Sequence, residues 1–71
     1  MKIEYDASVD ALVIQLRAGK YAGSDEVAPN VIMDFDEQGE PLAIEILNAR
    51  RVLNLEGTLT LEVPVGEVTV R

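Results

Sequence analysis

The sequence contains no cysteine, no histidine and no tryptophan among its 71 residues. Without cysteine it cannot form disulfides, so it is not built like small secreted domains, which are usually rich in them. Without histidine it lacks the commonest metal ligand and the usual base that activates a serine nucleophile. A domain of this size is marginally stable and usually needs disulfides, a metal or association. These absences therefore favour a homo-oligomer, with a dimer as the simplest form.

Long apolar runs are also missing. No stretch approaches the roughly 20 apolar residues that a membrane-spanning helix needs. The first ten residues carry Glu4, Asp6 and Asp10 and no apolar run, which is unlike a secretory signal peptide. We therefore expect a cytoplasmic protein with no membrane partner.

Basic residues are scarce. Six lysines and arginines stand against 13 aspartates and glutamates, which gives a net charge of −7. Such a chain repels phosphate backbones, so nucleic-acid binding is disfavoured. The charge favours a basic protein partner, although a charge of this size also serves simply to keep a small domain soluble.

Apolar and polar residues alternate with a period of two in most of the chain, which is typical of β-strands. The alternating segments are 2–5, 11–17, 31–36, 42–47 and 58–63, with 68–70 continuing the pattern and a weaker strand around 25–28. Glycine-containing connections at 18–23 and 36–40 separate several of them. The chain is predicted to be one domain over 1–71, with a C-terminal β-hairpin extension at about 54–71. The fold class is mainly β, or α+β if residues 48–55 form one short helix, arranged as a small antiparallel meander or an open barrel.

Both faces of the predicted sheet carry apolar residues. The predicted core consists of Leu12, Ile14, Leu16, Met33, Phe35, Leu42, Ile44 and Ile46. A second set, Ala11, Val13, Ile32, Ala43 and Leu47, falls on the opposite face. A half-exposed antiparallel sheet is normally polar on its solvent side, so the second set needs cover from the short helix or from another subunit. Val13, Ile32 and Leu47 are accordingly the predicted interface residues.

Three carboxylates match the spacing of a calcium-binding EF-hand loop. Asp34, Asp36 and Glu45 occupy loop positions one, three and twelve, and Gly39 occupies position six. However, Pro41 stands where that loop needs a backbone donor, and both flanks are predicted strands instead of helices. Strand alternation also accounts for the acids. No metal or cofactor is therefore assigned, and a divalent-metal binder or a small carboxylate-dependent enzyme is kept as the alternative function.

The remaining polar residues make no recognisable catalytic site. Asp6 and Asp10 flank the first loop, and two carboxylates can share acid–base work, but hydrogen bonding within a turn is their usual role in such loops. Ser8 and Ser24 have no histidine to activate them. No catalytic residue is assigned, and the sequence favours a non-enzymatic domain for protein interaction or self-association.

Two segments carry a resemblance to a known family. Residues 5–16 have the pattern Tyr-Asp-x-x-x-Asp-Ala-Leu-x-Ile-x-Leu, and residues 34–49 have the pattern Asp-x-Asp-x-x-Gly-x-x-Leu-x-Ile-Glu-Ile-Leu-Asn-Ala. Over about residues 1–53 the chain resembles the prokaryotic family catalogued as domain of unknown function 2283, with Ala43 where a glycine is often found. The resemblance implies a small β-rich prokaryotic protein and no established activity. Some small families of this kind are encoded beside toxin-like proteins, which adds the hypothesis that the chain neutralises a basic toxin-like partner.

Overall fold

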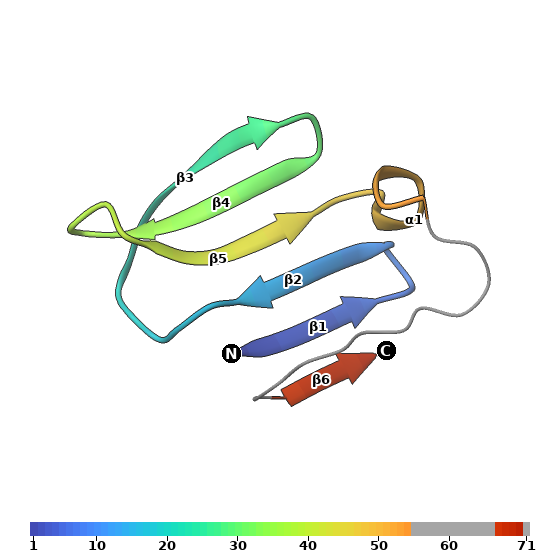
Figure 1. Ribbon diagram of the computed structural model, residues 1–71, viewed down its shortest axis with the longest axis horizontal. Coiled ribbons are helices and arrows are strands. Elements are labelled where there is room, and N and C mark those ends of the chain that lie inside the picture. Colours follow the sequence, from blue (N-terminus) through green and yellow to red (C-terminus); the bar gives the residue numbers. More distant parts are fainter. Residues whose placement is uncertain (55–66, 71) are drawn as a thin grey trace.

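The computed structural model describes residues 1–54 and 67–70, which form one twisted sheet and one short helix (Figure 1). The strands are β1 (Lys2–Asp6), β2 (Ala11–Gln15), β3 (Tyr21–Ala28), β4 (Val31–Asp36), β5 (Pro41–Ile46) and β6 (Glu67–Val70), and the helix is α1 (Ala49–Val52). Their order in the sheet is β3-β4-β5-β2-β1-β6. Within the described residues no helix is long and apolar enough to cross a membrane.

The predicted antiparallel β fold is confirmed. Strands β1 to β5 pair antiparallel throughout, and the sheet is open, so the meander description fits its β3-β4-β5 half. The short helix predicted within 48–55 is present as the four residues of α1. The C-terminal hairpin predicted at about 54–71 lies mostly outside the described residues. Its described part is β6, which pairs in parallel with β1.

One strand is longer than the sequence pattern indicated. Residues 18–23 were expected to be a connection, but β3 begins at Tyr21. Its pairing with β4 contains irregularities between Tyr21 and Gly23 and between Glu26 and Ala28. Side chains along β3 are almost all exposed. Pairing with β4 therefore holds this strand in place, since it has no apolar alternation of its own.

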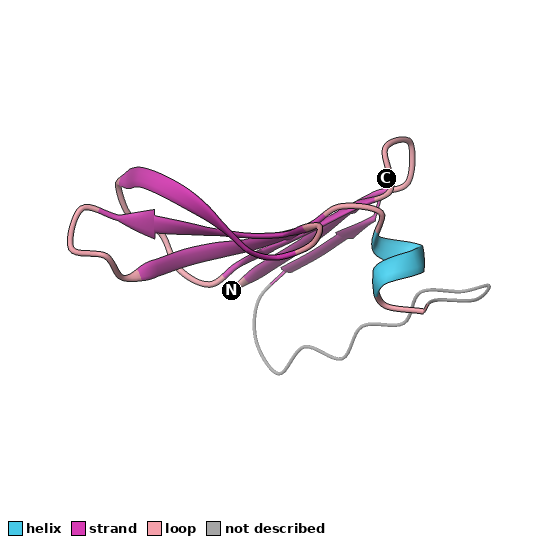
Figure 2. Ribbon diagram, turned by 90° about the horizontal axis from the view of Figure 1, so that it is seen from above, coloured by secondary structure: helices cyan, strands magenta, loops and turns pink. Residues whose placement is uncertain are grey.

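The core lies on the face of the sheet that α1 covers (Figure 2). Its buried members are Ile3, Tyr5, Leu12, Ile46 and Ala49, and the half-buried Ile14, Ile44 and Val52 pack against them. The centre of the predicted core is thereby confirmed. Leu16 is different, because it lies one residue beyond β2 and is 36% exposed.

The connection from β2 to β3 passes beside β5 to reach the far edge of the sheet. The backbone N–H groups of Leu16 and Arg17 both donate to the carbonyl of Leu42 in β5, at 2.7 and 3.4 Å. At Gly19 a Cβ atom would lie 2.6 Å from Cδ2 of Leu42, which is itself buried. A larger residue at position 19 would therefore require the buried Leu42 side chain to shift where the connection passes β5. We refer to residues 16–20 as the crossover loop.

The difference between Leu12 and Leu16 gives a test of this core. Replacing Leu12, which is 2% exposed, with alanine should lower the free energy of unfolding by about 2–5 kcal/mol, because it leaves a cavity beneath α1. The same substitution at Leu16 should cost less than about 1 kcal/mol. Urea denaturation followed by circular dichroism measures both. Equal losses at the two positions would show that the core is misplaced.

Candidate functional site

The face of the sheet opposite α1 is covered by none of the described elements (Figure 2). Side chains alternate along a strand, so residues that lie between the core positions project to this side. Strand register arranges them in two rows across the sheet. One row is Glu4, Val13, Glu45, Ile32 and Glu26, and the next is Lys2, Gln15, Ala43, Asp34 and Ser24. These ten residues are called the open face.

Apolar and acidic side chains are interleaved on the open face. Val13 and Ile32 are half-buried and flank Glu45 in the first row, while Ala43 is 8% exposed in the second. Leu47, the third predicted interface residue, follows the end of β5 and is 41% exposed. The structure thus places two of the three predicted interface residues together. Whether any of them contacts another chain stays a prediction.

The carboxyl group of Glu45 on the open face lies close enough to Asp34 to be influenced by it. Burial raises the pKa of Glu45, and the negative charge of Asp34 and a hydrogen bond with it raise that pKa further. Oδ1 of Asp34 also accepts a hydrogen bond of 2.6 Å from the Ser24 hydroxyl, which lies 2.7 Å from the hydroxyl of Tyr21. The middle of the open face therefore holds two acidic side chains, Asp34 and Glu45, close together.

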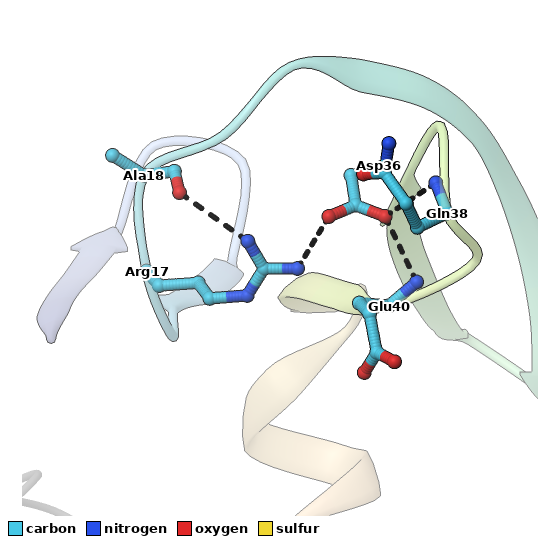
Figure 3. Close-up of polar contacts among 5 residues, drawn as sticks. All are labelled: Arg17, Ala18, Asp36, Gln38 and Glu40. Atoms are coloured by element: carbon cyan, nitrogen blue, oxygen red, sulfur yellow. Dashed lines mark hydrogen bonds and ion pairs between the residues drawn. The ribbon is translucent and has the colours of Figure 1, made fainter.

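Asp36 has a different environment from Asp34 and Glu45 (Figure 3). Its Oδ1 accepts the backbone N–H groups of Gln38 and Glu40, both at 2.9 Å, which shapes the hairpin between β4 and β5. Its Oδ2 accepts a charged hydrogen bond of 2.6 Å from Arg17 in the crossover loop. These contacts, with that from Arg17 the largest, lower the pKa of Asp36. Through these interactions Asp36 links the crossover loop to the β4–β5 hairpin.

The three predicted metal candidates are therefore not gathered into one site. Asp34 and Glu45 are neighbours, but the carboxylate of Asp36 is occupied by the chain's own donors. Among the residues that the structure describes, no group of three or more histidine, cysteine, aspartate or glutamate side chains could hold a metal ion. Gly39 has a φ of +79°, which fits its role in the hairpin turn.

The first loop contains a second structural carboxylate. Asp10 adopts a left-handed backbone conformation with a φ of 53°, and its Oδ1 accepts a 2.7 Å hydrogen bond from the Tyr5 hydroxyl. The Asp10 carboxylate also accepts the backbone N–H of Arg50, at 3.2 and 3.4 Å to its two oxygens, while its carbonyl accepts the N–H of Ala49 at 3.0 Å. Asp10 therefore caps α1 from a distance of 40 residues along the chain.

The residues around this cap have structural roles as well. Asp6 accepts hydrogen bonds from the backbone N–H and the hydroxyl of Ser8, which forms the turn. Asn48 precedes α1 with a φ of 50°, and its Nδ2 donates to the Asn30 side chain at 3.1 Å. The acid–base role considered for Asp6 and Asp10 has no support from this geometry. The sequence carried no sign of the cap, because its two partners are far apart in the chain.

Comparison with known proteins places this arrangement within a family. A family model described as "Protein of unknown function (DUF2283)" matches residues 2–50, which include β1 to β5 and the start of α1. An uncharacterized protein of Methanocaldococcus jannaschii is 34% identical over 56 residues, which cover 79% of this chain and 47% of the relative. The chain thus spans about half the length of that relative. No solved structure matches the chain significantly.

The cap predicts a coupled loss of stability. Replacing Asp10 with alanine should lower the free energy of unfolding by about 1–3 kcal/mol, because it leaves the N–H of Arg50 and the Tyr5 hydroxyl without their acceptor. Tyr5→Phe should destabilise the native chain but add little in the Asp10→Ala background, since both changes remove the same hydrogen bond. Denaturation of both single variants and the double variant measures the coupling. Additive losses would mean that the two side chains act independently.

The pair on the open face predicts a pH dependence. An acid whose pKa is raised on folding is destabilising when ionised, so its contribution worsens as the pH rises through that pKa. Glu45→Gln should therefore raise the thermal midpoint at neutral pH and leave it little changed at about pH 3, where the carboxyl group is protonated. Glu26→Gln, in the same row at the exposed sheet edge, removes the same charge and is the control. Equal stabilisation by both would point to the net charge alone.

Proposed function

Since the chain belongs to the DUF2283 family, whose description assigns no activity, we propose a function from its geometry: a non-catalytic protein-interaction domain that binds a basic protein partner through the open face. The observation that carries this proposal is the position of Val13 and Ile32 on the side of the sheet that α1 does not cover. One-sided antiparallel sheets usually present polar residues to solvent, so apolar side chains here favour contact with another chain.

Charge decides which kind of partner is favoured. The open face contains four acids, Glu4, Glu26, Asp34 and Glu45, and one base, Lys2. The net charge of the whole chain is −7. A basic surface would complement this face and speed encounter with it. A basic toxin-like protein, held inactive by this chain in the cytoplasm, is the specific form of the proposal.

Self-association is less well supported. Two copies packed through the open face would bring their acidic residues together, and like charges in apposition are destabilising. The β3 edge is also poorly suited to pairing with a copy of itself, because it carries Asp25 and Glu26 and two irregularities in its pairing with β4. A homodimer is accordingly the competing outcome of the experiment below.

The proposal predicts a native complex that depends on the open face. The full chain, recovered by gentle affinity capture from its own host cells, should contain a stoichiometric basic protein when its native mass is measured. Val13→Lys and Ile32→Lys should each weaken that complex about tenfold or more, because each places a cation where the partner's own cations and apolar groups dock. Val9→Lys makes the same substitution in the first turn, at a side chain 66% exposed, and should leave the complex intact.

The alternatives give different results. A native mass that is a multiple of this chain's own mass would indicate a homo-oligomer. If Val13→Lys reduces that mass to the mass of one chain, the open face is the surface through which the copies associate. A basic partner that survives both open-face substitutions would contradict the proposed surface.

A further inference from the structure

A hollow of about 260 Å³ lies where the crossover loop borders the open face. Val13, Leu42 and Ala43 supply its apolar lining, and Gln15, Tyr21 and Asp34 supply polar groups. We call it the crossover hollow. Sites for small molecules usually enclose roughly 300–1,000 Å³ and bury most of the ligand, so a hollow of this smaller volume suits a single side chain better than a metabolite.

The small side chain of Ala43 helps to create the hollow. Along the second row of the open face it lies between Gln15 on β2 and Asp34 on β4, both of which have longer side chains. This arrangement leaves a narrow apolar surface at Ala43, with a polar group on either side. The methylene stem of a long side chain can cover such a surface while its polar end reaches the flanking groups.

The charge at the hollow favours a cation. Asp34 lines it, and Glu45 lies close enough for the Asp34 charge to raise the pKa of Glu45. Arg17, the basic residue among the described lining residues, already forms a 2.6 Å ion pair with Asp36, so that positive charge is offset. A cation between Asp34 and Glu45 would relieve the unfavourable proximity of the two carboxyl groups.

We infer that the crossover hollow takes one arginine side chain of the basic partner, with the guanidinium on Asp34 and the methylene stem over Val13 and Ala43. This inference rests on the proposed function, because it names the anchor by which that partner docks. Arginine fits better than lysine, since its planar group donates two parallel hydrogen bonds to one carboxylate, is less strongly hydrated and stacks on aromatic rings such as Tyr21.

The probe for this anchor is N-acetyl-arginine amide, titrated into the full chain and followed by amide chemical shifts in NMR spectra. The neutral comparison is N-acetyl-citrulline amide, which has nearly the same shape without the charge. We expect the arginine probe to shift the amides of Val13, Asp34 and Ala43 and to bind about fivefold more tightly than citrulline, as an exposed ion pair allows. Equal binding of the two probes, or shifts away from these amides, would overturn the inference.

Three substitutions make the test specific. Asp34→Asn should abolish the preference for arginine, whereas Asp25→Asn, the same change on β3 outside the hollow, should leave it intact. Gln15→Lys places a competing cation at the hollow from an exposed position and should also abolish it. The NMR spectrum of each variant shows directly whether it is folded. Retained preference in Asp34→Asn, or preference for an anionic probe such as N-acetyl-aspartate amide, would contradict an arginine site.

Failure of this inference can be told apart from failure of the proposed function. If the native basic partner is lost with Val13→Lys and Ile32→Lys but binds the Asp34→Asn variant with unchanged affinity, the open face binds the partner and the arginine anchor is wrong. If the partner still binds the Val13→Lys, Ile32→Lys and Asp34→Asn variants with unchanged affinity, the proposed function is wrong as well. If Asp34→Asn weakens the partner about fivefold and Asp25→Asn does not, both stand.

Discussion

The packing of α1 against one face of the sheet is the contact on which the rest of this structure depends. A helix of four residues is far too short to be stable alone, so it depends on the packing of Ala49 and Val52 in the core and on the hydrogen bonds that Asp10 accepts from the backbone N–H groups of Ala49 and Arg50. Because α1 covers the side that carries Ile3, Tyr5 and Leu12, the opposite side is left without a cover among the described elements. Alternate residues of β1, β2 and β5 thus form the core on one side of the sheet and the candidate site on the other.

Period-two alternation was enough to predict the strands that form the centre of the sheet. β2, β4 and β5 lie within one or two residues of their predicted bounds, because each buries apolar side chains on at least one face. Only the second half of β3, around 25–28, was predicted, since the stability of this strand comes from hydrogen bonds with β4 and not from side-chain burial. Leu16 continues the alternation of β2 but lies past its end, where the chain turns into the crossover loop. A pattern shows which face a residue would take in a strand but not where the strand stops.

The site was less predictable than the sheet. Alternation placed Val13 and Ile32 on the second face correctly, but the neighbouring arrangement of Asp34 and Glu45 depends on strand order, which the sequence does not reveal. Asp36 was grouped with them by spacing alone, whereas in the structure Arg17 and the hairpin backbone occupy it. Several residues of the family motifs, among them Asp10 and Asn48, prove to be structural, so matching them to a family carries information about the fold more than about the activity.

The position of the crossover loop has a consequence for how the chain assembles. The pairs β1–β2, β3–β4 and β4–β5 each join strands through a short turn, but the seam between β2 and β5 brings together Leu12 and Ile46, which are about 34 residues apart. Forming that seam requires closure of the longest loop among these antiparallel pairs, and its entropy must be lost before the contacts across it are gained. Two locally paired halves, β1–β2 and β3–β4–β5, therefore meet at a single seam. The ion pair between Arg17 and Asp36 links the two halves near that seam. Once it has formed, a shorter loop has to close when β2 pairs with β5.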